Sequence, residues 1–284
     1  MNGSPVRDER RERMRELTRR GHAGQSRNGG RLPYWVHTDA VADICDRALR
    51  RTGELPPDEA ADLVLAAHGH DLYEDTGVTA ETVRELFGAR VDAWIDGMTN
   101  RKGDRDRADY MRHLASSDDG TRVIKCADLI DNMLSVAYGL HDLGLEWARE
   151  FFLPIASETR EILLATPFTR LPATGTYLTG LVDWAWERLA GSMETAAAVA
   201  AEAAGTAEAS GTAEASRRPD TGGAMADDRE ELPPEVKAMV ERLSFTPEEW
   251  AESVAAVKAR DREKREKLFG DKEPFAIPDT ETDS

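Results

Sequence analysis

One apolar segment of the sequence ends in residues suited to acid–base or metal chemistry. The run Leu63-Val-Leu-Ala-Ala-His-Gly leads into His70 and Asp71, and Glu74 and Asp75 follow. A polar group in an apolar segment costs free energy unless a partner or a ligand satisfies it. If the helix continues here, His70 and Glu74 share one face and Asp71 and Asp75 share another, because residues four apart lie on the same side of a helix.

Two further segments carry residues of the same kind. Asp128 and Asn132 are four apart in a second apolar segment, and His37 begins a third. Two imidazoles and two carboxylates from three helices form a nitrogen and oxygen site that suits Mn, Fe or Mg. Such an ion lowers the pKa of bound water and stabilises charge on phosphoryl oxygens, which is phosphohydrolase chemistry. The simpler explanation of Asp128 is a structural ion pair with Lys125 or Arg122.

The elements that position these residues are predicted to be helices only, so the predicted fold class is all-α, a helical bundle. Apolar residues recur at helical spacing, and the alternation typical of strands is missing. Val41, Ile44 and Ala48 are expected to face inward on the helix that His37 begins. The predicted helices are Thr38–Arg51, Asp58–His70, Thr79–Phe87, Ala89–Met98, Arg107–Ser116, Asp119–Tyr138, Glu146–Ala165 and Thr176–Ala190.

The sequence changes character near residue 190. Beyond it, the near-duplicates Gly205-Thr-Ala-Glu-Ala-Ser and Gly211-Thr-Ala-Glu-Ala-Ser contain no large apolar side chain, so burial cannot offset the entropy of ordering. Further on, Thr246-Pro-Glu-Glu is a capping box that predicts a short helix. The predicted divisions are a charged N-terminal helix or arm (1–20), the main domain (21–190), a disordered linker (191–230), a helical appendix (231–270) and a disordered tail (271–284).

Composition narrows the function further. The 284 residues carry a net charge of −17, which argues against a DNA or RNA partner. No apolar run approaches the roughly 20 residues of a membrane helix, and the N-terminus does not resemble a signal peptide. Cys45 and Cys126 are too few for a disulfide scaffold or a thiolate zinc site, so we expect a cytoplasmic protein. The appendix is either a docking peptide for a protein partner or an extra helix on the main domain.

Several short sequence motifs, taken in order, resemble those of a known family. The order of His37, His70-Asp71 and Asp128 looks like the HD-domain metal phosphohydrolases. These motifs narrow the resemblance to the hydrolase domain of RelA/SpoT-type alarmone enzymes and their stand-alone small relatives. The resemblance covers about residues 20 to 140. The motifs are the segment from His22 to His37, His70-Asp-Leu-Tyr-Glu-Asp-Thr76, Phe87-Gly-Ala-Arg-Val91, Gly97-Met-Thr99 and Lys125-Cys-Ala-Asp-Leu-Ile-Asp-Asn132.

The resemblance implies a role for each matching residue. The metal, manganese in this family, would be held by His37, His70, Asp71 and Asp128. Glu74 and Asp75 would orient and deprotonate the attacking water. Arg27 would lie against a guanine base, while Asn132 and Ser135 would contact the ribose. The implied reaction removes pyrophosphate from the 3′ position of guanosine tetraphosphate or pentaphosphate, so the implied partner is a small anionic nucleotide.

The chain also departs from the family's pattern. Asn28 stands where a lysine usually follows Arg27, and Leu129, Asp131 and Leu134 occupy positions that often carry other, frequently basic, residues. These changes remove positive charge near the expected nucleotide. The basic residues after Thr99 are an alternative source of phosphate contacts, or else ordinary solvated charge: Arg101, Lys102, Arg105 and Arg107.

Two other functions therefore stay open beside alarmone hydrolysis. One is an HD phosphohydrolase for another nucleotide or phosphate ester, which the lost basic residues favour. The other is a regulator that binds metal and nucleotide without turnover, which would have no need of Glu74 and Asp75. No second module with alternating strands and helices is evident, so alarmone synthesis is not expected.

Overall fold

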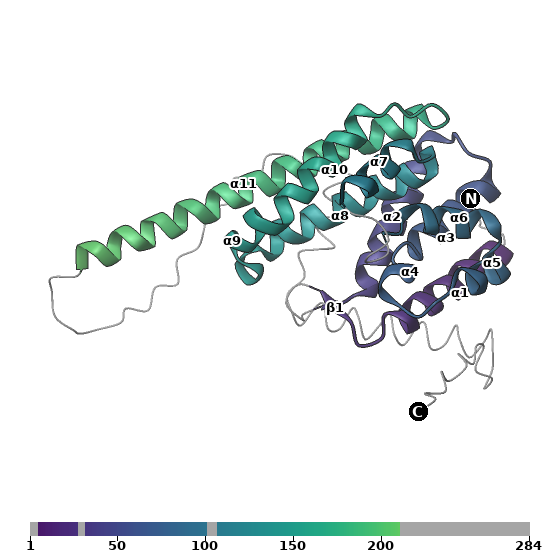
Figure 1. The fold of residues 1–284 in the computed structure, drawn as a ribbon, viewed down its shortest axis with the longest axis horizontal. Coiled ribbons are helices and arrows are strands. Elements are labelled where there is room, and N and C mark those ends of the chain that lie inside the picture. The colour runs from purple at the N-terminus through teal and green to yellow at the C-terminus, as the bar shows by residue number, and fades with distance from the viewer. Residues whose placement is uncertain (1–4, 28–31, 101–106, 211–284) are drawn as a thin grey trace. The chain divides into compact units, whose positions relative to one another are not determined.

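The structure, a computed structural model, describes residues 5–27, 32–100 and 107–210 (Figure 1). The predicted all-α class is confirmed. None of the helices that the structure describes is both long and apolar enough to cross a bilayer. The helical elements are α1 (Pro5–Gly21), α2 (Trp35–Thr52), α3 (Pro57–His68), α4 (Leu72–Asp75), α5 (Ala80–Phe87), α6 (Ala89–Met98), α7 (Arg107–Ser116), α8 (Asp119–Leu143), α9 (Leu145–Trp147), the π-helix η1 (Ala148–Phe152), α10 (Leu153–Ala165) and α11 (Pro172–Ser210).

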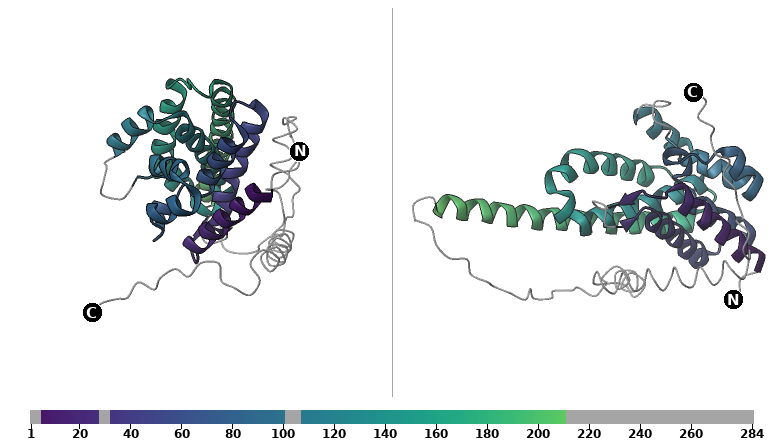
Figure 2. Two further views of the ribbon diagram at one scale, coloured as in Figure 1. Left: turned by 90° about the vertical axis from the view of Figure 1, so that its right-hand side faces the viewer. Right: turned by 90° about the horizontal axis from the view of Figure 1, so that it is seen from below.

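Helix α8 lies at the centre of the core. Helices α2, α3, α6, α10 and α11 all pack against it, and α1 packs on α2 and α3 (Figures 1 and 2). Ile124, Ile130 and Met133 of α8 are fully buried, as are Leu63 of α3 and Ile95 of α6. Burial of large apolar side chains is the main stabilising term of such a bundle. The residues that α8 carries are therefore held in a fixed place.

Local signals start and stop the helices that matter for the site. The Asp118 side chain caps α8 by accepting a hydrogen bond from Thr121 N at 2.8 Å. Gly53 ends α2 in the left-handed conformation, with φ 66°, where a side chain would be strained. The start of α11 is capped from a distance, since Glu54 accepts hydrogen bonds from the backbone N–H groups of Ala173 and Thr174 at 2.8 and 2.7 Å.

The sequence predicted no strands, but the structure contains one small hairpin. Strands β1 (Ser26–Arg27) and β2 (Leu32–Pro33) pair antiparallel, with Arg27 opposite Leu32. Two-residue strands are too short to show an alternating pattern. The predicted helix Glu146–Ala165 is also interrupted, because its first half is the short α9 followed by the π-helix η1.

Beyond residue 190 the structure differs from the predicted linker over its first part. Helix α11 continues to Ser210, so residues 191–210 are helical, and its end extends past α8 and α10 (Figures 1 and 2). The alanines of this stretch have the highest intrinsic helix propensity, which favours continuation of the helix. The rest of the linker, the appendix and the tail lie outside the described residues.

Candidate metal centre

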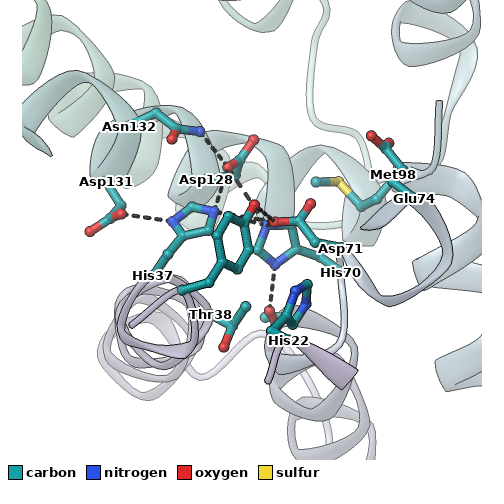
Figure 3. A network of polar contacts seen from close by, with 12 residues as sticks. His22, His37, Thr38, His70, Asp71, Glu74, Met98, Asp128, Asp131 and Asn132 are labelled. Atoms are coloured by element: carbon teal, nitrogen blue, oxygen red, sulfur yellow. Dashed lines mark hydrogen bonds and ion pairs between the residues drawn. The ribbon is translucent and has the colours of Figure 1, made fainter. Parts of the chain in front are cut away.

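Three separate segments bring the predicted ligands together at one place beside α8 (Figure 3). His37 lies in the first turn of α2, and Asp128 lies in the middle of α8. His70 and Asp71 come from the short connection between α3 and α4. His37 and His70 expose only 3% and 1% of their surface, so these imidazoles are buried polar groups that require partners.

The connection between α3 and α4 corrects one prediction. Helix α3 ends at His68 rather than at His70, so the shared helix face predicted for His70 and Glu74 does not form. The chain turns at Gly69, whose N–H still bonds back to Leu65 O at 3.1 Å. A Cβ on Gly69 would lie 2.8 Å from Ile95 Cδ1, so glycine permits the close packing of this turn. The turn aims the His70 side chain toward His37.

The four side chains present their donor atoms within a small volume. His37 Nε2 lies 3.2 Å from His70 Nε2. The same His37 atom lies 3.5 Å from Asp71 Oδ2 and 3.2 Å from Asp128 Oδ1. His70 Nε2 lies 3.0 Å from Asp71 Oδ2 and 3.7 Å from Asp128 Oδ1. His37, His70 and Asp71 alone form a group whose donor atoms all lie within 4.8 Å of one another, and Asp128 adjoins both histidines.

This donor set fits a divalent metal ion. Ligand atoms about 2.1 Å from one ion lie about 3 Å apart when they are neighbours. The separations of 3.0 to 3.7 Å match that requirement. Imidazole nitrogens with carboxylate oxygens are ligands of Mn, Fe and similar ions, whereas no thiolate is present in the group.

The electrostatics of the cluster also favour a cation. Burial lowers the pKa of His37, as does Arg27, but hydrogen bonds to Asp128, Asp131 and Asp71 outweigh both and raise it to about 9. Burial lowers the pKa of His70 too, yet Asp71 and Asp128 raise it to about 10. The surrounding carboxylates thus create a negative site that takes up positive charge, either as protons or as a metal ion.

Polar neighbours fix the orientation of Asp71 and His70. The Tyr34 hydroxyl donates a hydrogen bond to Asp71 Oδ2 at 2.7 Å. Burial and the nearby Asp71 raise the pKa of Tyr34 far above its ordinary value, so this donor keeps its proton. His70 Nδ1 lies 2.9 Å from the backbone oxygen of Ala67, which directs His70 Nε2 into the cluster. Such contacts around a metal centre set the geometry of the ligands.

Asp128 also makes the simple ion pair that the sequence left open. Lys125 Nζ lies 2.8 Å from Asp128 Oδ2, while Asn132 donates from Nδ2 to Asp128 Oδ1 at 2.6 Å. The other candidate, Arg122, pairs with Asp119 instead. The Lys125 pair and a ligand role are compatible, because the pair engages Oδ2 whereas Oδ1 faces both histidines.

The two predicted catalytic carboxylates lie on α4, next to the cluster. Glu74 accepts a hydrogen bond from the backbone N–H of Asn100. Burial raises the pKa of Glu74 despite that bond, and the neighbouring Asp71 and Asp75 add to the rise. The raised pKa moves this carboxyl group toward the range of a general base. Asp75 is exposed at the end of α4, and its backbone oxygen accepts a hydrogen bond from Gln25 at 2.7 Å.

Of the predicted substrate-binding residues, Asn132 lies on the opposite side of His37 from Glu74 (Figure 3). Arg27 donates from one guanidinium nitrogen to Asp131 Oδ2 at 2.6 Å and from another to Asn132 Oδ1 at 2.5 Å. Ser135 lies one turn further along α8. Among the basic residues offered as phosphate ligands, Arg101, Lys102 and Arg105 lie outside the described residues. Arg107 forms an ion pair with Glu158 at 2.6 Å.

Sequence reasoning missed the roles of Asp131 and Tyr34. In the sequence Asp131 stands out only as a lost positive charge, whereas in the structure its Oδ2 lies 2.7 Å from His37 Nδ1. The available signal was spacing, because Asp131 follows Asp128 by three residues and therefore shares its helix face. Tyr34 precedes His37 by three residues and offered a similar signal.

The fold and site together define an all-α protein with a buried cluster of two histidines and two aspartates. No protein-family model matches the sequence. The chain is 32% identical over 155 residues to a GTP pyrophosphokinase from Streptomyces coelicolor, which covers 51% of this chain and 17% of that protein. It is 28% identical over 186 residues to the guanosine-3′,5′-bis(diphosphate) 3′-pyrophosphohydrolase of Aquifex aeolicus, which covers 63% and 24%.

A third relative is the guanosine-3′,5′-bis(diphosphate) 3′-pyrophosphohydrolase of Haemophilus influenzae, which is 40% identical over 83 residues. The match covers 29% of this chain and 11% of that protein. The chain thus spans less than a quarter of each of these three relatives. A solved structure described as a metazoan orthologue of SpoT that hydrolyses ppGpp aligns with a TM-score of 0.48 and 21% identity, covering 63% of this chain and 96% of that one. The predicted resemblance to RelA/SpoT-type enzymes is confirmed by the sequence comparisons.

Proposed function

We propose that the protein is a metal-dependent phosphohydrolase that removes pyrophosphate from the 3′ position of guanosine tetraphosphate or pentaphosphate. The observation that carries the proposal is the convergence of His37, His70, Asp71 and Asp128 from three segments onto separations that suit one ion. Similarity to 3′-pyrophosphohydrolases supports the substrate. We further propose manganese as the ion and the cytoplasm as the location.

Each residue has a distinct role in the proposed reaction. His37, His70, Asp71 and Asp128 would hold the ion, which when bound would lower the pKa of water and neutralise phosphoryl charge. Glu74, assisted by Asp75, would take the proton of the attacking water. Water then adds across the bond between the ribose 3′-oxygen and the diphosphate, so pyrophosphate leaves and the ribose regains a hydroxyl group.

The nucleotide would bind on the side of Arg27, Asn132 and Ser135. Arg27 is engaged by Asp131 and Asn132 in this structure. A guanine base lying against Arg27 can stack on the flat guanidinium face while the edge keeps these hydrogen bonds. Asn132 and Ser135 would then offer polar groups to the ribose.

A second candidate is hydrolysis of another nucleotide or phosphate ester by the same centre. It is favoured by Asp131, a carboxylate that neutralises Arg27 where the alarmone enzymes often carry a different residue. Net positive charge at the nucleotide side is thereby reduced, which would weaken binding of a highly anionic substrate.

The test is hydrolysis by the purified full chain with Mn²⁺. Labelled guanosine tetraphosphate is incubated in parallel with a panel of ordinary nucleotides and phosphate esters, and released pyrophosphate and phosphate are measured. Pyrophosphate from the alarmone alone supports the first proposal, and turnover of other substrates alone supports the second. Tight nucleotide binding without product under Mn²⁺, Mg²⁺ or Fe²⁺ would overturn both in favour of a binding protein. Asp183→Asn is a matched control that should hydrolyse substrate as the wild type does. The carboxylate that it removes pairs with Arg160 between α10 and α11.

A further inference from the structure

The two histidines of the cluster are oriented by different kinds of acceptor. His70 Nδ1 faces a neutral backbone oxygen, that of Ala67. His37 Nδ1 instead faces a carboxylate oxygen, Asp131 Oδ2, at 2.7 Å (Figure 3). An ionised carboxylate only accepts hydrogen bonds, so a proton stays on His37 Nδ1 and Nε2 is the nitrogen that would offer its lone pair to a bound ion.

Asp131 is itself held in place by Arg27. The same oxygen, Oδ2, accepts a hydrogen bond from Arg27 at 2.6 Å. The side chains of Arg27 and Asp131 are only 15% and 19% exposed, so each partly buried charge is neutralised by the other. Arg27 belongs to β1, and the pair therefore ties the hairpin to α8.

Arg27 reaches the second α8 side chain of the cluster by a parallel route. It donates to Asn132 Oδ1, and Asn132 donates in turn to Asp128 Oδ1 at 2.6 Å. A single guanidinium group therefore supports two residues, one beside His37 and one beside Asp128. Planar, forked donors such as arginine suit this bridging geometry.

We propose that Asp131 is a positioning residue that orients His37 for metal binding, and that Arg27 acts on the metal centre by holding Asp131. The inference rests on the metal site of the proposed function, but not on the identity of the substrate. It gives Arg27 a role in metal binding in addition to the one toward a nucleotide base. It also explains why an acidic residue is accommodated beside an expected anionic substrate.

The test is a calorimetric titration of the metal-free full chain with Mn²⁺, comparing wild type with Asp131→Asn, Arg27→Gln and the double variant. Asp131→Asn is expected to weaken Mn²⁺ binding about 10- to 100-fold, the usual effect of removing a carboxylate behind a histidine ligand. Arg27→Gln is expected to weaken binding less. The loss of affinity in the double variant should be smaller than the product of the two single losses, since Arg27 acts in part through Asp131. Asp183→Asn should bind Mn²⁺ as wild type does.

A second measurement separates positioning from general structural damage. Because Asp131→Asn changes the affinity for the ion rather than the chemistry, its kcat should recover most of the wild-type value at saturating Mn²⁺. Equal Mn²⁺ affinity in wild type and Asp131→Asn overturns the inference, as does a loss of kcat that excess Mn²⁺ does not restore. If Asp131→Asn does not fold, unchanged Mn²⁺ affinity in Arg27→Gln overturns it instead.

The outcomes also distinguish this inference from the proposed function. Weakened Mn²⁺ binding in Asp131→Asn, together with no hydrolysis of guanosine polyphosphates by the wild type, leaves the inference standing and removes the proposed substrate. If the wild type hydrolyses guanosine polyphosphates but Asp131→Asn binds Mn²⁺ with wild-type affinity, the proposed function stands and the inference is overturned. A wild-type chain that binds no Mn²⁺ overturns both.

Discussion

Lys125 Nζ lies 2.8 Å from Asp128 Oδ2, one turn earlier on α8. Desolvation opposes the charge of this ammonium group, but the neighbouring Asp128 carboxylate outweighs it and raises the pKa of Lys125 well above its ordinary value. The cation therefore stays charged next to a proposed metal ligand. Asp128 thus serves a stabilising ion pair and the candidate centre together.

Asp128→Asn should affect both roles. It leaves Lys125 without its carboxylate, so the free energy of unfolding should fall by roughly 3 kcal/mol, the lower end of the range for broken buried pairs. Metal content, measured on protein purified with Mn²⁺, should be lost as well. Loss of stability with full metal content would leave Asp128 with the structural role only. Denaturant unfolding of Asp183→Asn is the control.

Glu74→Gln should separate metal binding from the chemical step. The amide keeps the size of the side chain but cannot accept a proton, so the rate should fall at least about a hundredfold while bound Mn²⁺ is unchanged. Single-turnover kinetics with metal analysis of the same sample checks this. A normal rate would show that Glu74 is not the base.

The raised pKa of Glu74 also predicts a pH dependence of stability. Burial raises the pKa of the folded carboxyl above 4.5, so between pH 4.5 and the folded pKa the folded state binds more protons than the unfolded state. The free energy of unfolding should therefore decrease as pH rises through this window. Comparing Glu74→Gln with wild type by denaturant unfolding across pH 4 to 8 isolates the contribution, which should shrink in the variant.

Tyr34→Phe should weaken the metal centre without emptying the core. The ring that stacks on His22 is retained, but the donor to Asp71 is lost. We expect Mn²⁺ affinity to fall several-fold and the free energy of unfolding to fall by about 1 kcal/mol, the usual net value of one hydrogen bond. Calorimetry and thermal unfolding of the same protein measure the two effects. Unchanged affinity would mean that Asp71 needs no help from Tyr34.

Gly69→Ala should disturb the turn that aims His70. The added methyl group would meet Ile95 Cδ1 at 2.8 Å, Leu72 Cδ1 at 3.1 Å and Met14 Sδ at 3.2 Å. These are flexible side-chain ends, so we expect a moderate cost of about 1–3 kcal/mol, as for other overpacked sites. Gly77→Ala is the matched control, because nothing lies within 4 Å of its added Cβ. Equal melting temperatures of the two variants would refute the packing argument.

Metal removal should lower stability, and the four clustered ligands are the reason. Mn²⁺ at about 100 times its dissociation constant should add about 2.7 kcal/mol to the free energy of unfolding. Thermal unfolding with a chelator and then with excess Mn²⁺ measures the difference. The shift should vanish in His70→Asn. A shift that persists in His70→Asn would place the ion elsewhere.

The sequence predicted most of the helices because their apolar spacing is local information. Ala89–Met98 and Arg107–Ser116 have the predicted bounds in the structure. The break at Gly69 could not be predicted in the same way, because it depends on close packing against Ile95 of another helix. The continuation of α11 to Ser210 was not predicted because the stretch lacks large apolar residues at helical spacing, whereas alanine favours helix through its intrinsic propensity.

For the site, the sequence identified the groups but not their connections. The order of His37, His70-Asp71 and Asp128 pointed to one centre, and the structure brings these residues together. Their roles stay predictions. Spacing places Asp131 on the helix face of Asp128, but its direct contact with His37, 94 positions away in the sequence, depends on how α2 packs on α8.

Helix α8 carries Asp128, Asp131 and Asn132 within little more than one turn, above the fully buried Ile130 and Met133. Reshaping either apolar side chain would rotate or shift that turn, and every polar contact on it would move together. Activity of this protein should therefore be sensitive to conservative changes such as Ile130→Val that touch neither ion nor nucleotide.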